Sequence, residues 1–355
     1  MQDEAAGWRA LAALYNALAT ASVVATVVRR GEPAARELVF SLFRRQHLEK
    51  FLPGLAKLGL DREPHAVACA LYHYHSNALG GVKTEYLRES DRKAWVRYPP
   101  PRWMWRGTSI AAIPHSVSAA MLHGWHGHNG VSLGNPRLGF VCTGMTVDGM
   151  PGLEGYYLEH DRDLAEDERV RFAYGEDTMP RVDPATMPAL EAAAWPAERR
   201  ARTHRAYATA YIRTLLEVLD ALPDAPAARE TFAHAARLTG LQFHEDTAGS
   251  LGLPTNLNTG STQSAAQFAQ WLAAMLAAQG ESVKVTSSAK GADVRMAGWR
   301  LLQGAASVDR IAAFEAWNAL WTGACAAHDR FLALEATPAS LGSGFAVHWR
   351  IVARA

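Results

Sequence analysis

The chain has 355 residues, of which 49% are hydrophobic and 20% charged, as in an ordinary globular protein long enough for two domains. Its 36 basic and 35 acidic side chains give a formal net charge of +1, so no basic surplus points to nucleic acid. The three cysteines Cys69, Cys142 and Cys325 lack CxxC spacing, which argues against a disulfide framework. We therefore expect a cytoplasmic protein that does not bind nucleic acid.

One uncharged segment, residues 11–28, has the length of a membrane span. It includes Asn16, Thr20, Ser22 and Thr26, so it is poorly apolar, and it lacks the small-residue cleavage site of a signal peptide. We expect a buried helix here and no binding to membranes.

Two short motifs indicate that the chain contains the same module twice. The sequence Pro-Ala-Ala-Arg-Glu occurs at 33–37 and at 226–230, and Leu-Gly-Leu occurs at 58–60 and at 251–253. Both repeats have the same offset of 193 residues, which chance rarely produces. The second copy then holds about seven extra residues at 254–260, after which the offset is about 200.

Apolar periodicity and capping residues predict the elements in chain order. Pro64 suits the first turn of a helix, Ser261 suits an N-cap, and Gly80 and Gly280 suit helix C-termini. In the first half we expect helices at 7–28, 33–50, 64–79 and 108–126, strands at 82–87 and 93–98, and a hairpin of strands 140–147 and 156–160. In the second half we expect helices at 203–221, 226–240, 261–279 and 308–326, strands at 282–287 and 292–296, and a hairpin of strands 331–336 and 345–352.

These elements predict an α+β fold made of two tandem copies of one module, each with about four helices packed on a small antiparallel sheet. The first module, residues 1–160, carries the candidate site. Residues 161–202 have no counterpart and contain several prolines among many charges, so we expect a linker. Residues 203–355 form the second module, which we expect to act as a scaffold.

A first candidate group lies on the helix at 64–79. His65, Cys69 and His73 are spaced four residues apart and share one helix face. Imidazole and thiolate are both zinc ligands. The same row in the second copy is alanine, as at Ala265 and Ala269, which is typical of close helix packing. The row is either a ligand or substrate site, or a set of hydrogen-bonded core and surface side chains.

A second group follows at the end of the helix expected at 108–126. His123, His126 and His128 are followed by Asn129, among glycines that we expect to bend the backbone. Three imidazoles on a bent segment can converge for proton transfer or metal binding. The alternative is a polar helix terminus.

Aromatic side chains near these histidines could wall a pocket for a flat ligand, or could be plain core. The candidate substrate-binding residues are Tyr72, His75, Trp103, Trp105, Trp125 and Asn129. Cys142, on the following hairpin, is either a nucleophile activated by His126 or His128, or a buried small hydrophobic residue.

The motifs Val-Arg-Tyr-Pro-Pro at 96–100, Gly-Asn-Pro-Arg-Leu at 134–138 and Phe-Val-Cys at 140–142 resemble the L-2-aminothiazoline-4-carboxylic acid hydrolase family. That family is in turn similar to 4-vinyl-reductase-type ligand-binding domains. The resemblance covers residues 65–160 and implies hydrolysis of a ring C–N or C–S bond. Tyr98 stands where the family pattern has a cysteine. The family's second cysteine, near the fourth helix, has no obvious match here, and His126 or His128 lies close to its place instead.

We therefore expect an enzyme that acts on a small cyclic or aromatic compound, with hydrolysis first and a lyase or isomerase reaction next. The expected catalytic residues are His73, His126, His128 and Cys142. No cofactor is required, although zinc could bind among His65, Cys69, His73, His123, His126 and His128. A binding module without catalysis and a structural histidine row are the alternatives. A homo-oligomer is compatible with the sequence.

Overall fold

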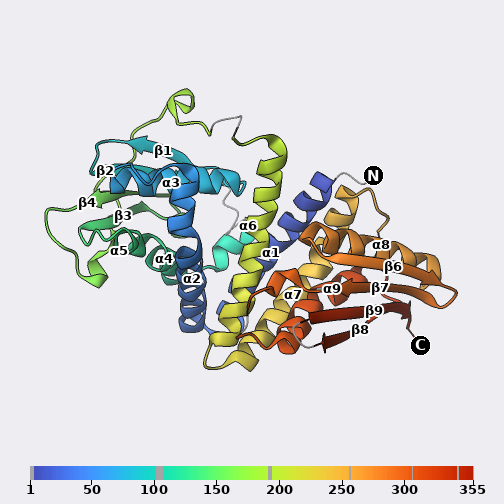
Figure 1. The fold of residues 1–355 in the computed structure, drawn as a ribbon. Helices are drawn as coiled ribbons and strands as arrows, with labels where there is room; N and C mark the ends of the chain where they lie inside the picture. The colour runs from blue at the N-terminus through green and yellow to red at the C-terminus, as the bar shows by residue number, and fades with distance from the viewer. Residues whose placement is uncertain are drawn as a thin grey trace. The chain divides into compact units, whose positions relative to one another are not determined.

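The computed structural model describes residues 4–100, 107–190, 194–255, 257–305, 307–341 and 344–354, and these residues form an α+β fold (Figure 1). The chain divides into two compact units. The central unit comprises Arg30–Arg200, and the terminal unit joins Met1–Arg29 to Ala201–Ala355. This division differs from the predicted modules because the first helix belongs to the same unit as residues 201–355.

The first helix, α1 (Glu4–Arg30), is held in the terminal unit by buried polar contacts. The hydroxyl of Tyr15 donates to Gln279 and accepts a hydrogen bond of 3.1 Å from the indole N–H of Trp317. By length and composition α1 could cross a membrane, but 56% of its most apolar window is buried, as in a core helix.

The central unit is a sheet with helices on one face (Figure 1). Its elements are α2 (Glu32–Leu58), α3 (His65–Leu79), β1 (Glu85–Arg88), β2 (Lys93–Tyr98), α4 (His115–Gly124), α5 (Asn129–Ser132), β3 (Leu138–Gly144), β4 (Leu153–Glu159) and β5 (Val170–Phe172). The strand order is β1-β2-β4-β3-β5, and α3 lies across β1, β2 and β4. Strand β5 pairs with β3 in parallel, so the expectation of a purely antiparallel sheet is wrong for this unit.

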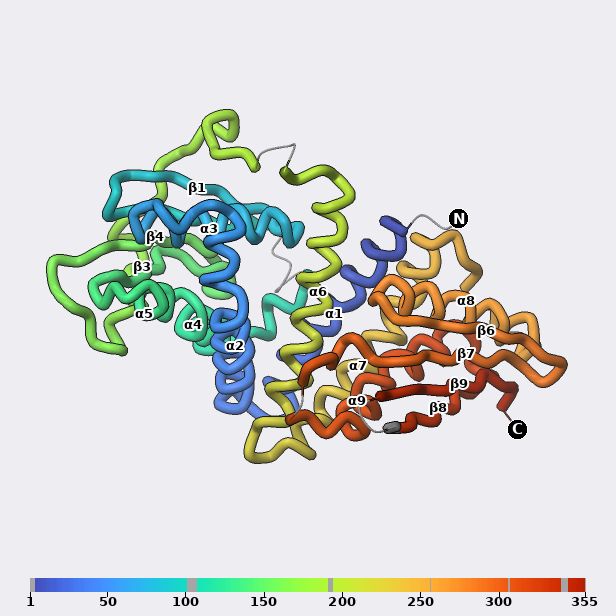
Figure 2. Tube along the Cα trace, in the orientation of Figure 1, coloured from blue at the N-terminus to red at the C-terminus, as the bar shows by residue number. Residues whose placement is uncertain are grey.

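After its first helices, the terminal unit runs through a helix, two strands, a helix and two strands (Figure 2). The central unit has the same order apart from its additional α5 and β5. Its elements are α1, α6 (Ala197–Ala221), α7 (Ala225–Ser250), α8 (Thr262–Gln279), β6 (Ser282–Ser288), β7 (Gly291–Ala297), α9 (Arg310–His328), β8 (Leu332–Leu341) and β9 (Gly344–Ala353). The sheet is antiparallel with the order β6-β7-β9-β8, which matches the order of the first four strands of the central sheet.

The repeated motifs mark the two ends of one helix in each unit. The proline of each Pro-Ala-Ala-Arg-Glu motif lies in the first turn, of α2 and of α7. Gly59 and Gly252 follow the helix C-termini with φ of 71° and 66°, the left-handed conformation that glycine adopts readily. The next residue in each case, Leu60 or Leu253, donates a 2.9 Å hydrogen bond back into the last turn, as in a Schellman motif.

Most predicted elements are present, but three helices differ from their predicted bounds, and α5 and β5 were not predicted. Helix α7 runs to Ser250, well beyond the predicted end at residue 240. Helix α2 continues through Pro53 to Leu58, beyond the predicted end at residue 50. The helix expected at 108–126 is a 3-10 turn, Gly107–Ala112, followed by α4 after Pro114. Pro114 explains this break, because the residue before a proline disfavours the helical conformation.

Glycines let two pairs of helices cross at close range. A Cβ atom on Gly124 of α4 would lie 2.6 Å from the carbonyl oxygen of Phe40 on α2. In the terminal unit, a Cβ atom on Gly323 of α9 would overlap the carbonyl oxygen of Arg237 on α7. Gly124 does not have a positive φ. The helix does end at Gly124, as predicted. What this glycine provides is the absence of a side chain at the crossing with α2.

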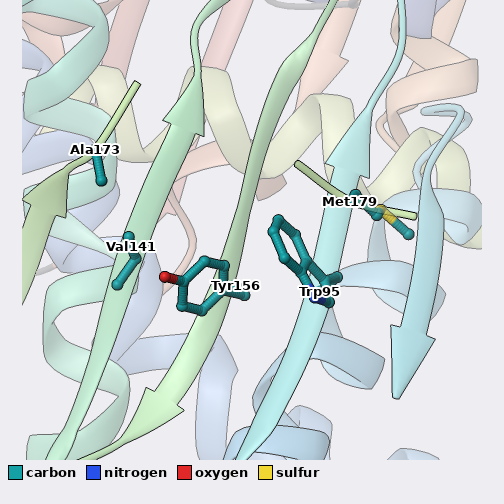
Figure 3. Close-up of a cluster of buried hydrophobic side chains, with 5 residues drawn as sticks. All are labelled: Trp95, Val141, Tyr156, Ala173 and Met179. Atoms are coloured by element: carbon teal, nitrogen blue, oxygen red, sulfur yellow. The ribbon is translucent and has the colours of Figure 1, made fainter. Parts of the chain in front are cut away.

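The sheet of the central unit is also covered on the face away from its helices. Trp95, Val141 and Tyr156 point outward from neighbouring strands and pack against Ala173 and Met179 (Figure 3). Residues 161–202, predicted to be a linker, thus supply both strand β5 and the cover of this outer face.

We predict that Gly323→Ala lowers the free energy of unfolding by about 1–3 kcal/mol, because its methyl group would force apart α7 and α9. Chemical denaturation measures the change. Gly249→Ala on α7 is the matched control, since the space around Gly249 is open and alanine favours a helix. Equal stability of the two variants would contradict the proposed close crossing.

Candidate functional site

Polar and aromatic side chains gather in the central unit between α3, the segment after α4, and the inner face of the sheet. We call this group the Asn129 cluster. It consists of His47, Cys69, Tyr72, His73, Trp125, His126, Asn129, Phe140 and Tyr157.

Three local features bring these side chains together. Cys69 and His73 lie one turn apart on α3 and share its inner face. Helix α4 ends at Gly124, and the following turn presents His126 and Asn129 toward α3. Phe140 of β3 and Tyr157 of β4 are direct cross-strand partners on the inner face of the sheet.

The rings form a stack around the two imidazoles. The ring centroids of His73 and His126 are 4.2 Å apart with an interplanar angle of 11°. The phenol of Tyr157 is nearly parallel to both, with centroids 5.8 Å from His73 and 5.9 Å from His126. Phe140 closes one side, 4.6 Å from His126.

Asn129 is the polar centre of the cluster and is completely buried. Its amide nitrogen donates to the hydroxyl of Tyr157 at 2.9 Å and lies 3.4 Å from Nε2 of His73. Among the described residues, neither its amide oxygen nor the indole N–H of Trp125 has a hydrogen-bond partner. Buried polar atoms without partners are uncommon, and they often mark positions where a ligand or water binds.

Burial keeps four titratable groups of the cluster, His47, Cys69, His73 and Tyr157, uncharged at neutral pH. Desolvation, assisted by His47, lowers the pKa of His73 to about 3. Desolvation, assisted by the guanidinium of Arg44, lowers the pKa of His47 to about 3. Burial raises the pKa of Cys69 and Tyr157, so both stay protonated. The cluster is therefore a set of neutral donors and acceptors.

The predicted residues that meet in the cluster are Cys69, Tyr72, His73, Trp125, His126 and Asn129. His128 lies at its margin, with its ring centroid 6.2 Å from that of His47 and Nδ1 2.8 Å from the carbonyl oxygen of His123. Sequence reasoning missed His47, Phe140 and Tyr157. His47 carried a visible signal, because the offset of 193 places it opposite Gly240.

Other predicted residues have different surroundings. His65 hydrogen-bonds Asn135 at 3.1 Å. His75 packs beside Tyr74, with ring centroids 4.9 Å apart, and His123 packs near Phe172.

Cys142 is buried on β3, where its thiol donates to the carbonyl oxygen of Gly144 at 3.4 Å. Trp103 and Trp105 lie outside the described residues.

Within the described part of the chain, no group of three or more histidine, cysteine or acidic side chains is arranged to hold a metal ion. The face-to-face stacking of His73 and His126 explains this for the cluster. Imidazoles bind a metal through in-plane nitrogen lone pairs, and two stacked rings do not aim those lone pairs at one point.

The corresponding region of the terminal unit holds a hydrogen-bond network around His328 and Asp329. His328 contacts Nε2 of His244 at 3.1 Å and the carbonyl oxygen of Ser264 at 3.1 Å. Asp329 accepts from the Ser264 hydroxyl and from the backbone N–H groups of Thr259 and Gly260. Asp329 thus holds the backbone at Thr259 and Gly260, whereas Asn129 at the corresponding position faces imidazoles.

A second polar group in the central unit was also missed. Asp148 contacts Nδ1 of His115 at 2.8 Å and accepts from the Tyr174 hydroxyl at 2.9 Å. This group is partly exposed, since the side chain of His115 is 44% exposed. Its members are too far apart in the sequence, at 115, 148 and 174, for spacing to reveal the contact.

Comparisons of this chain with protein-family models, with curated proteins and with solved structures found no match.

We predict that His73→Asn reduces the dependence of stability on pH. The pKa of His73 is about 3 in the fold against an ordinary value of 6.5, so the unfolded chain takes up the proton first. The contribution of the neutral His73 to the free energy of unfolding is fully present above the ordinary pKa of 6.5. It is lost as the pH falls toward 3, and the free energy of unfolding decreases by roughly 2–3 kcal/mol between pH 7 and pH 4.

Hydrogen exchange of the α3 amides, measured from pH 4 to pH 7, gives the local stability around His73. His65→Asn, on the same helix but outside the cluster, is the matched control and should keep the wild-type slope. If local stability changes with pH in His73→Asn as steeply as in the wild-type chain, the imidazole of His73 is not held neutral by burial.

Proposed function

We propose that the central unit is an enzyme that hydrolyses a small cyclic or aromatic compound at the Asn129 cluster. The observation that carries this proposal is the stacked pair of imidazoles, His73 and His126, beside a buried amide and a phenol. Such a set combines proton acceptors and donors in one place without a permanent charge.

The surroundings of the pair favour a flat, uncharged substrate. Tyr72, Trp125 and Phe140 contribute aromatic faces and edges next to the imidazoles. Cys69, His73 and Tyr157 are uncharged at neutral pH, so an ionic ligand would lose its hydration without gaining a counter-charge. A heterocycle with a polar bond to be cleaved suits these surroundings.

In the proposed reaction, one imidazole of the pair accepts a proton from a water molecule as its oxygen attacks the ring carbon. The bond from that carbon to nitrogen or sulfur breaks, and the proton returns to the leaving atom. It passes either directly from the same imidazole or through the second imidazole, which takes up that proton as it gives its own. The free lone pair of the Asn129 oxygen could accept a substrate N–H, while its amide nitrogen holds Tyr157. A lyase or isomerase would use the same two proton-transfer groups.

We also propose that the two units descend from one duplicated module and that the terminal unit is the scaffold. Support comes from the common strand order, from the matching helix boundaries at Pro33 and Pro226, and from the matching glycine caps. The resemblance of residues 65–160 to L-2-aminothiazoline-4-carboxylic acid hydrolases supports ring hydrolysis as the reaction type.

One observation favours a second candidate function, the binding of a ring compound without chemical change. Proton transfer is most effective when the pKa of the catalytic group is near the working pH. The pKa of His73 is about 3, far below neutral, and catalysis would require substrate binding to raise it. A binding module has no such requirement.

We predict that His73→Asn and His126→Asn each lower kcat by about 10²-fold or more, because each removes a proton-transfer group. The assay screens cyclic amides, amidines and thiazolines and follows the gain of one water by mass spectrometry.

His75→Asn is the matched control, because His75 is a buried histidine of α3 that lies outside the cluster. Thermal unfolding of each variant separates loss of chemistry from loss of fold. Binding of a ring compound that yields no product, and that both cluster variants retain, would contradict the enzymatic proposal.

A further inference from the structure

The sheet of the terminal unit carries a groove of about 450 Å³ on the face that points away from its helices. One row of side chains runs across all four strands in register. Lys284 pairs with Arg295, Arg295 with His348, and His348 with Thr337. All four residues line the groove. Lys284, Arg295 and Thr337 are exposed, and His348 is half-buried.

The same row in the central unit is apolar and covered. There Leu87 pairs with Trp95, Trp95 with Tyr156, and Tyr156 with Val141. Met179 and its neighbours pack over this row (Figure 3). The terminal sheet thus presents cationic side chains at the register positions where the central sheet buries a hydrophobic cluster.

The depth of the groove comes from the next row of the terminal sheet, which contains only small side chains. Ser282 pairs with Ala297, Ala297 with Ala346, and Ala346 with Ala339. In the central unit the equivalent row holds long charged side chains, with Arg97 bridging Glu85 and Glu154. The methyl groups therefore form an apolar floor beside the cationic row.

Two of the cations in this row have no ion-pair partner among the described residues. Nearby basic side chains do have acidic partners. His348 of the same row pairs with Asp293 at 2.6 Å, and Arg350, which lies outside the row, pairs with Glu335 at 3.2 Å. Lys284 and Arg295 form no such pair, although they are direct cross-strand neighbours with Cβ atoms about 5 Å apart. Like charges placed opposite each other destabilise a sheet unless an anion lies between them.

We propose that this groove binds a small organic carboxylate with a short apolar body. The guanidinium of Arg295 has the planar donor pair that a carboxylate accepts, and Lys284 adds a second positive charge beside it. The apolar body lies on the floor formed by Ala297, Ala339 and Ala346. A groove of this volume accommodates a ligand of that size.

The test is a titration of the full chain, carrying ¹³C-labelled alanine methyl groups, with hexanoate. The methyl signals of Ala297, Ala339 and Ala346 should shift with a dissociation constant on the order of 1 mM. The double variant Lys284→Gln/Arg295→Gln should bind about tenfold more weakly. Raising the salt concentration should also weaken binding by the wild-type chain.

Two variants serve as controls. Lys290→Gln removes a positive charge from the turn of the same hairpin, outside the groove, and should leave hexanoate affinity unchanged. Ala346→Phe fills the floor while keeping both cations, and should abolish binding. The proposal is overturned if hexanoate shifts none of these methyl signals, if the double variant retains wild-type affinity, or if uncharged hexanol binds equally well. Tighter binding of hexyl phosphate than of hexanoate would also overturn the assignment to a carboxylate.

Discussion

The central unit depends on burying polar side chains without burying charge. Asn129 and His73 lie in its core, and a charged group there would lose its hydration at a cost of several kcal/mol. The imidazoles meet this constraint by staying neutral, and the amide of Asn129 meets it by donating to Tyr157. The same constraint gives the cluster its chemical character, because neutral groups that can both accept and donate protons are retained in an apolar environment.

The terminal unit solves the same problem in a different way. Its Asp329 is held by a hydroxyl and by backbone N–H groups, and its pKa is lowered by these bonds against the effect of burial. That arrangement satisfies the carboxylate and holds the backbone at Thr259 and Gly260. The polarity of the outer sheet faces is also reversed between the units. The central unit covers an apolar row that includes Trp95, and the terminal unit leaves the row with Arg295 exposed.

The sequence predicted the helices and strands well wherever a local signal set their limits. Pro33 marked the start of α2 and Gly280 the end of α8 through backbone geometry that proline and glycine provide by themselves, whereas the end of α2 at Gly59 was not predicted. The site was predicted only in part, because His73 and His126 were visible as additions to one copy, whereas Tyr157 belongs to an ordinary-looking strand. The place of α1 could not be predicted, since it depends on buried contacts of Tyr15 with residues more than 260 positions away.

The most direct test of the account is ¹⁵N NMR of the ring nitrogens of His73 and His126, recorded at pH 7 with and without cyclic amides and thiazolines. The account predicts two neutral imidazoles whose ring signals move when a ring compound binds, while the signals of His65 stay in place. Ring signals of His73 and His126 that no such compound perturbs would contradict it, because the cluster would then be only part of the hydrophobic core.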